Sequence, residues 1–243
     1  MDEFSEIALA IACPMANEGE GAVRFVRAVL DRCQGFRKVT FIAVLDTVSR
    51  DDTLERLREL KKQEPRLAVV WAPENRHLVD AYVRGYREAL AAGSDWILEI
   101  DAGFSHRPED ISGFFEKMRQ GYDCVFGRRF IKGGGMTDIS ALRYMVSRGG
   151  TLLANLLLGT RLKDMTSGFE LFSRAALEMV LERGIQSRAH FFQTEIKTYC
   201  RGLRLAEVPI HYRSPSPRLS SSALKDSFRQ LWRLYQLRRA GAL

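Results

Sequence analysis

Acidic and amide side chains follow apolar runs at three places in the first half of the sequence. Asn17 and Glu18 follow the first run, Asp46 ends the second, and Asp101 ends the run WILEI. A carboxylate at the end of a buried run is costly unless it meets a cation, a hydrogen-bond donor or water. Asp101 could hold Mg²⁺ or Mn²⁺ against a diphosphate, because these cations prefer carboxylate and phosphate oxygens. Each of these residues taken alone could equally serve in a turn or cap a helix.

Two arginines have positions suited to binding phosphate. Arg129 lies at the end of an expected strand, and Arg148 follows a serine where a helix is expected to begin. A planar guanidinium can bind a phosphate through two hydrogen bonds and keeps its charge at neutral pH. A solvated surface charge is the alternative for either residue.

The apolar runs that carry these residues are spaced as the strands of a mostly parallel sheet. Strands are predicted over residues 7–13, 39–45, 67–71 and 96–100, with amphipathic helices over 22–33, 53–62, 78–92 and 108–120. This alternation is typical of βαβ units. Ligands of such open sheets bind beyond the carboxyl ends of the strands, where the three polar segments lie.

The second half of the sequence begins with a glycine-rich, basic loop, GRRFIKGGG, at residues 127–135. Its three consecutive glycines are not expected inside a regular element, so it is either a mobile active-site loop or a plain surface loop. A leucine-rich helix around residues 152–158, the segment KDMTSGFELFS and a strand over 205–210 follow. Residues 214–223 are predicted to form a short polar linker.

The composition indicates one soluble α/β domain. The chain has 243 residues, 46% of them hydrophobic, and a formal net charge of +7, which favours an anionic partner. Its four cysteines form no CxxC pair, so neither a disulfide framework nor a zinc site is expected, and a cytoplasmic location fits best. The acidic start is unlike a secretory signal, and no run is apolar for long enough to span a bilayer. The basic residues match no nucleic-acid-binding module, so nucleic acid is not an expected partner.

A basic amphipathic helix is predicted over residues 224–243, after a domain over residues 1–223. Apolar residues recur at helical spacing, and basic residues occupy the other faces. Such a helix could dock on the domain or lie in a membrane interface, and the sequence leaves both open. The apolar set is Leu224, Phe228, Leu231, Trp232 and Tyr235; the basic set is Lys225, Arg229, Arg233, Arg238 and Arg239.

Eight segments follow one another in the order known from one enzyme family. They are PMANEGE, LDTVSRDDT, EIDAGFSH, FGRRF, VSRGG, KDMTSGFELF, FFQTE and LAEVPIHY. From about Ile7 to Leu224 the chain resembles the dolichyl-phosphate mannosyltransferase-like branch of family 2 glycosyltransferases. The resemblance implies the GT-A fold, an α/β nucleotide-diphospho-sugar transferase fold with a mostly parallel central sheet flanked by helices.

The resemblance also implies roles for individual residues. Asp101 would hold the metal, and Arg129 and Arg148 would contact phosphates, so these three are the expected catalytic residues. Gln193 and Glu195 could orient a substrate or merely pair with neighbours on a helix. The expected nucleotide-binding residues are Pro14, Asn17, Glu18 and Asp46, and those on the sugar and acceptor side are Thr166, Ser167, Gly168, Gln193 and Glu195.

The chain departs from the family pattern at the metal site. Gly103 replaces a second acidic residue, so one expected ligand is missing, and Ser105 and His106 are the available substitutes. A lost metal, a weaker site and a preference for Mn²⁺ over Mg²⁺ are all open. His106 could instead cap the next helix. Thr47 replaces an aspartate of the nucleotide segment, so contacts to the base could differ.

The implied activity is inverting transfer of a sugar from a GDP- or UDP-linked donor to a polyprenyl phosphate. The enzyme would act as a peripheral protein at the inner face of a membrane. One alternative is a hydroxyl acceptor on a saccharide or metabolite, which would need a carboxylate base. Another is a non-catalytic nucleotide-sugar-binding subunit that partners a membrane protein. A homo-oligomer is also possible.

Overall fold

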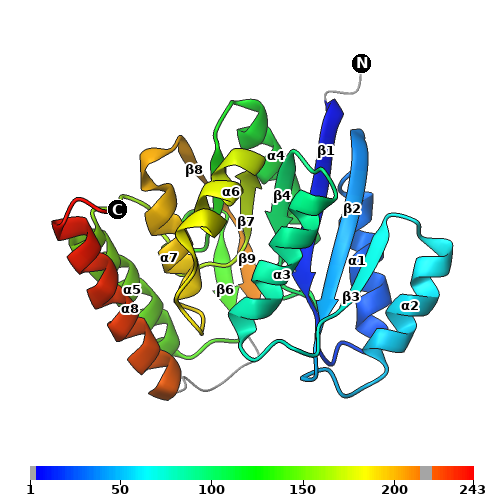
Figure 1. Ribbon diagram of the computed structural model, residues 1–243, viewed down its shortest axis with the longest axis horizontal. Coiled ribbons are helices and arrows are strands. Elements are labelled where there is room, and N and C mark those ends of the chain that lie inside the picture. The colour runs from blue at the N-terminus through cyan, green and yellow to red at the C-terminus, as the bar shows by residue number, and fades with distance from the viewer. Residues whose placement is uncertain (1–3, 214–220) are drawn as a thin grey trace.

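A seven-stranded sheet forms the centre of the computed structural model, which describes residues 4–213 and 221–243 (Figure 1). The strand order is β3-β2-β1-β4-β7-β5-β8. All neighbours are parallel except β7, which runs antiparallel to both β4 and β5. The mostly parallel sheet predicted from the sequence is therefore confirmed. The strands are β1 (Phe4–Pro14), β2 (Phe36–Leu45), β3 (Leu67–Trp71), β4 (Trp96–Glu99), β5 (Cys124–Arg128), β7 (Glu170–Ser173) and β8 (Leu205–Pro209).

Helices cover both faces of this sheet and bury a separate apolar core on each (Figure 1). Strands buried on both faces read as continuous apolar runs, as β1 does from Ala8 to Cys13. Gly85 in α3 lets the helix approach β1, because a Cβ atom there would lie 3.1 Å from the Cβ of Ala12. One face carries α1 (Glu20–Asp31), α2 (Thr53–Gln63) and α4 (Ile111–Arg119). The other face carries α3 (Leu78–Ala91), α6 (Arg174–Arg183) and α7 (Phe192–Tyr199). The short helix η1 (Pro108–Asp110) precedes α4, and η2 (Cys200–Gly202) follows α7.

Two long helices, α5 (Ala141–Leu158) and α8 (Ser221–Arg239), lie side by side at one end of the molecule (Figure 1). The α8 helix packs on α5 and α7 and buries Leu231 and Leu234. It begins at Ser221, three residues before the predicted start, while residues 214–220 of the predicted linker lie outside the described part of the chain. The predicted boundary between the domain (residues 1–223) and the C-terminal helix (residues 224–243) stays a prediction.

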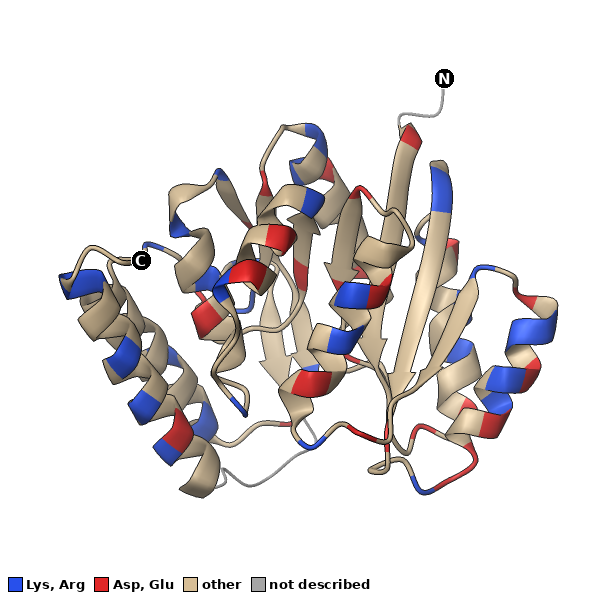
Figure 2. Ribbon diagram, viewed as in Figure 1, with Lys and Arg blue, Asp and Glu red and all other residues tan. Residues whose placement is uncertain are grey.

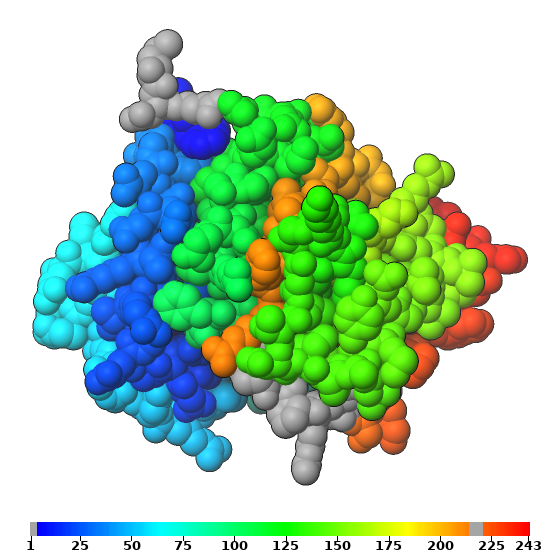
Figure 3. Space-filling model, turned by 180° about the vertical axis from the view of Figure 1, so that it is seen from behind, coloured from blue at the N-terminus to red at the C-terminus, as the bar shows by residue number. Residues whose placement is uncertain are grey.

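The structure corrects two local predictions. The side chain of Ser140 accepts a hydrogen bond from the backbone N–H of Arg143 and caps α5, so Arg148 lies inside this helix and not at its start. Gly135 is not in a loop but begins the short strand β6 (Gly135–Thr137), which pairs with β9 (His211–Arg213). In the view from behind, the orange segment containing β9 lies between the surfaces of two earlier parts of the chain (Figure 3).

All four cysteines are buried and free. Within the residues described, no helix is both long and apolar enough to cross a membrane.

Candidate functional site

The loops that follow β1 and β2 are joined by hydrogen bonds of Asn17. Its side chain donates to the carbonyl oxygen of Val48 at 2.9 Å and accepts from the backbone N–H of Arg50 at 2.9 Å. Its backbone has a positive φ of 59°, which asparagine tolerates better than most residues. Asp46 accepts a hydrogen bond from the N–H of Val48 in the same loop. The predicted nucleotide-binding residues Pro14, Asn17 and Asp46 thus lie together at the carboxyl edge of the sheet, where acidic residues gather (Figure 2).

Asp101 follows β4 at the same edge of the sheet. The hydroxyl of Tyr82, on α3, donates to its carboxylate at 2.5 Å. Its backbone N–H donates to Nδ1 of His106 at 3.2 Å. The His106 ring is buried and stacks on Phe169 at a centroid distance of 4.9 Å. Burial lowers the pKa of His106, which favours the neutral ring. Because Nδ1 accepts a hydrogen bond, Nε2 carries the proton of that neutral ring, so His106 positions the Asp101 backbone and offers no free nitrogen to a metal.

The predicted metal loop turns sharply at Gly103, which has a positive φ of 68°. A Cβ atom built there would lie only 2.6 Å from Oε2 of Glu18. Burial raises the pKa of Glu18, and the charges of Asp51 and Asp101 raise it further. Ser105 continues the loop, and its carbonyl oxygen accepts from the N–H of Arg213.

These residues fit a cation that is shared with a ligand. Within the described residues, no group of three or more histidine, cysteine, aspartate or glutamate side chains could hold a metal alone. Mg²⁺ is usually held by one or two carboxylates together with substrate phosphates and water. Glu18 and Asp101 follow the neighbouring strands β1 and β4 at this edge of the sheet and suit that arrangement, in which a diphosphate completes the coordination.

A cavity of about 440 Å³ leads from Asp101 to the helices α5 and α8. Its polar end includes Tyr82, Asp101 and Arg129, and Arg143 and His190 also line it. Its apolar end is lined by side chains of α5 and α8, namely Val146, Leu153, Leu224, Phe228 and Leu231, and Phe192 of α7 packs against Tyr82. The cavity therefore offers charge at one end and hydrocarbon at the other.

The residues predicted for the sugar and acceptor side divide into two groups. Thr166, Gly168 and Gln193 line the cavity. Ser167 is buried outside the lining, and its hydroxyl donates to the carbonyl oxygen of Gly127 at 2.5 Å. Glu195 is also buried outside it and accepts hydrogen bonds from the backbone of Ser187, the hydroxyl of Tyr199 and the guanidinium of Arg233 on α8. These contacts tie α8 and the loop before α7 together.

Arg129 forms a buried ion pair with Asp164. Its Nε donates to Oδ2 at 2.8 Å, its Nη2 donates to Oδ1 at 2.7 Å, and Nη2 also donates to the hydroxyl of Thr166 at 2.6 Å. Burial alone raises the pKa of Asp164, but the hydrogen bonds and charge of Arg129 outweigh it and lower that pKa. Asp164 belongs to the segment KDMTSGFELF, but sequence reasoning assigned no role to it. Within the described residues Nη1 of Arg129 has no hydrogen-bond partner, so this nitrogen is available to a phosphate.

Arg148 lies over a second cavity, of about 670 Å³, which it shares with Arg129 and Lys132. The guanidiniums of Arg129 and Arg148 lie 5.3 Å and 5.1 Å from the centroid of the Phe130 ring. Arg129 lines both cavities, whereas Arg148 lines only the second of them. The two predicted phosphate-binding arginines therefore lie near each other.

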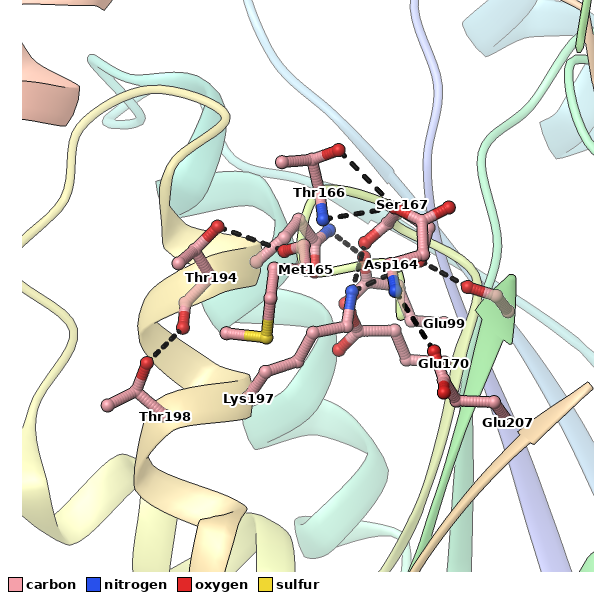
Figure 4. Close-up of polar contacts among 12 residues, drawn as sticks. Glu99, Asp164, Met165, Thr166, Ser167, Glu170, Thr194, Lys197, Thr198 and Glu207 are labelled. Atoms are coloured by element: carbon pink, nitrogen blue, oxygen red, sulfur yellow. Dashed lines mark hydrogen bonds and ion pairs between the residues drawn. The ribbon is translucent and has the colours of Figure 1, made fainter. Parts of the chain in front are cut away.

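A buried cluster of charges lies behind the site (Figure 4). Glu99 on β4 and Glu170 on β7 are opposite each other in the sheet. Lys197 of α7 forms an ion pair with Glu170 at 2.8 Å and donates to the carbonyl oxygen of Ser167 at 2.6 Å. Burial, and next the charge of Glu170, raise the pKa of Glu99 well above its ordinary value, which favours the protonated form. Glu99 also bonds to Tyr86 and to Gln193, which links the cluster to the wall of the cavity.

The helices α5 and α8 expose a broad apolar face. Leu152 and Leu156 of α5 are 70% and 75% exposed, and Phe228 and Trp232 of α8 are 64% and 58% exposed. Basic residues recur along α8 (Figure 2). Exposed apolar patches of this kind mark sites of interaction with proteins, ligands or membranes. The C-terminal helix is thus docked on the domain, as one of the two predicted alternatives states, and still exposes part of its apolar stripe.

Comparison with known proteins identifies the family. Residues 10–181 match the model of glycosyl transferase family 2. Over 173 residues the chain is 31% identical to an undecaprenyl-phosphate mannosyltransferase of Micrococcus luteus, an alignment that covers 70% of this chain and 71% of that one. It is 28% identical to a polyprenol monophosphomannose synthase of Mycolicibacterium smegmatis (83% and 76% covered) and 26% identical to a dolichol-phosphate mannosyltransferase of Pyrococcus furiosus (94% and 63% covered).

Solved structures agree on the fold. Glucosyl-3-phosphoglycerate synthase from Mycobacterium tuberculosis, solved in complex with UDP, superposes with a TM-score of 0.66 at 18% identity, covering 98% of this chain and 82% of that one. A second structure of that enzyme, with Mn²⁺, UDP and phosphoglyceric acid, gives a TM-score of 0.63 at 17% identity, with 98% and 80% covered. The central sheet, its flanking helices and these neighbours show the GT-A fold. The chain is a glycosyltransferase and belongs to family 2.

Proposed function

We propose that the protein transfers a sugar from a nucleotide-diphosphate sugar to a polyprenyl phosphate, with inversion at the anomeric carbon. The nucleotide would lie along the loops after β1, β2 and β4, where Asn17, Asp46 and Asp101 meet. Similarity to three enzymes that are named for mannosyl transfer to polyprenyl lipids supports the acceptor. GDP and UDP both stay open as the donor nucleotide.

The observation that carries this proposal is the shape of the cavity. It begins at Asp101 and Tyr82 and ends among Leu224 and Phe228 of α8. A phosphate joined to a long hydrocarbon chain needs a charged end beside the donor and an apolar exit, and this cavity has both. A saccharide or small metabolite would gain nothing from the apolar exit.

The chemistry of the lining also suits a phosphate acceptor. Among the described residues that line the cavity, Asp101 is the sole carboxylate, and it already accepts a hydrogen bond from Tyr82. A hydroxyl acceptor would need a general base, whereas a phosphate monoester is already ionised at neutral pH. Arg129, through Nη1, and Arg148 would hold anionic groups, so positioning and charge stabilisation would dominate the rate.

Asp101, with Ser105 and His106 in the same loop, is the predicted place for Mg²⁺ or Mn²⁺. A divalent cation bound there would neutralise the charge of the departing diphosphate. Tyr82 fixes the Asp101 carboxylate through its hydroxyl, and His106 fixes the backbone of Asp101 through Nδ1. These two contacts hold the carboxylate in place before any ligand binds.

The α5–α8 apolar face would meet the membrane in which the lipid acceptor lies. Phe228 and Trp232 are exposed beside the apolar end of the cavity, and basic residues such as Lys225 and Arg229 accompany them on α8. Each basic residue near an anionic membrane surface contributes on the order of 1 kcal/mol, and inserted apolar side chains add to this. Peripheral binding should therefore be reversible and sensitive to salt.

Transfer assays with matched acceptors test the function. The full chain is incubated with GDP- and UDP-sugars and with a short-chain polyprenyl phosphate, the corresponding polyprenol, or phosphoglyceric acid. We expect product only with the polyprenyl phosphate, because the polyprenol lacks the ionised oxygen and phosphoglyceric acid lacks the hydrocarbon chain. Transfer to a hydroxyl acceptor, with none to the lipid phosphate, would refute the proposal.

A further inference from the structure

Glu18 fills the space that a side chain at position 103 would need. The Cβ position of Gly103 lies 2.6 Å from Oε2 of Glu18 and 3.2 Å from both Cδ and Oε1. The Glu18 carboxylate, which belongs to the loop after β1, thus occupies space that an aspartate side chain at position 103 would need.

The surroundings of Glu18 hold its backbone and leave its carboxylate free. The N–H groups of Glu18 and Gly19 both donate to the hydroxyl of Thr53 at 2.9 Å. Among the described residues, no lysine or arginine forms an ion pair with Glu18 or Asp101, and no donor bonds to the Glu18 carboxylate. Asp101 instead acts on Glu18 as a nearby like charge. Two neighbouring carboxylates without a cation repel each other, and a divalent ion would remove that repulsion.

We propose that Glu18 supplies the carboxylate that Gly103 lacks, so that Asp101 and Glu18 together hold the divalent cation. This inference rests on the proposed function, because diphosphate oxygens complete the coordination. Two protein carboxylates with substrate phosphates are a usual environment for Mg²⁺ and Mn²⁺. The two protein ligands come from different loops, one after β1 and one after β4.

Direct titration with Mn²⁺ tests the assignment without any measurement of turnover. Free Mn²⁺ is followed by electron paramagnetic resonance in the presence of saturating UDP or GDP. Glu18→Gln keeps the shape of the side chain and removes its charge, so Mn²⁺ affinity should fall about tenfold or more, as losses around metal ligands usually cause. Glu20→Gln is the matched control, because Glu20 lies two residues further on with its side chain 88% exposed. It should bind Mn²⁺ as the wild type does, and thermal unfolding without metal checks that both variants fold.

The reciprocal exchange makes the test specific. Moving the carboxylate back, in the double variant Glu18→Ala/Gly103→Asp, should raise Mn²⁺ affinity above that of Glu18→Ala. Gly103→Asp alone should bring no gain, because its Cβ atom would collide with Glu18 and add a like charge. Wild-type Mn²⁺ affinity in Glu18→Gln, or no recovery in the double variant, would overturn the assignment.

Nucleotide binding with Mn²⁺ or with EDTA separates this inference from the proposed function. The binding of UDP and of GDP to the wild-type protein is measured by calorimetry under both conditions. Nucleotide binding that is indifferent to Mn²⁺ would overturn the role of Glu18 and leave the transferase proposal intact. Absence of nucleotide binding with and without metal would refute both.

Discussion

Removal of the Arg129 guanidinium should destabilise the protein strongly, whatever its effect on transfer. The side chains of Arg129 and Asp164 are 6% and 0% exposed, and three side-chain hydrogen bonds of Arg129 would be lost in Arg129→Ala. Asp164 would keep bonds from the backbone N–H groups of Arg129 and Thr166 but would lose the guanidinium of its ion pair. Breaking one side of a buried ion pair usually costs about 3 to 5 kcal/mol, which is a large share of the stability of a domain.

Urea unfolding measures this cost, with Arg148→Ala as the matched control. Arg148 is exposed, so its truncation should change the free energy of unfolding by less than about 0.5 kcal/mol. Because Arg129 lowers the pKa of Asp164, the stabilisation is present at neutral pH and is lost as the pH falls through the folded-state pKa. Arg129→Ala should therefore lose less stability than the wild type on acidification. A cost below about 1 kcal/mol at pH 7, the range of an exposed pair, would refute this reasoning and leave Arg129 free to act on phosphate alone.

Three further outcomes are expected. Glu99→Gln should gain stability relative to the wild type as the pH rises from 5 to 8, because burial raises the pKa of Glu99 in the folded state while the unfolded chain ionises at its ordinary pKa. An equal difference in the free energy of unfolding by urea at both pH values would count against this. A Phe228→Ser/Trp232→Ser variant should sediment less with anionic liposomes than the wild type does. Val48→Ser is the control, because Val48 is 62% exposed in the loop after β2, and it should sediment as the wild type does. Arg143→Ala should lower kcat/KM for a polyprenyl phosphate about tenfold or more, the scale of a charge-assisted hydrogen bond, and an unchanged value would exclude contact with the acceptor.

The fold was predictable because the sheet is buried on both faces. Strands such as β1 and β2 then contain unbroken apolar runs. The edge strand β3 is only partly buried but also has the predicted bounds. The place of β7 could not be predicted from these patterns. Its four residues leave no periodicity to read, and only tertiary pairing shows that it runs antiparallel between β4 and β5. The predicted start of α5 was wrong because the sequence offers two serines as helix caps. Ser140 caps the helix, whereas Ser147, seven residues later, lies inside it.

The candidate site was predictable as a set of loops, and less so as individual contacts. Asp101 lies at the end of its strand because the apolar run before it ends there. The partner of Arg129 is Asp164, 35 residues away, and no local spacing connects the two. The same holds for Glu18 and Gly103, since a missing side chain can be replaced by one from another loop only if the fold brings them together. The sequence shows which residue types are present, whereas the contacts of Arg129 with Asp164 and of Glu18 with Gly103 depend on tertiary packing.

The position of β7 has a consequence for synthesis of the chain. Residues up to β4 can form a four-stranded sheet as soon as they leave the ribosome, because β1 to β4 pair only with one another and with β7. β5 must wait with both edges unpaired, since its neighbours are β7, about 45 residues later, and β8, about 80 residues later. Such a waiting strand is exposed to wrong pairing with other nascent chains. Rapid translation from residue 124 to residue 213 should therefore favour correct folding.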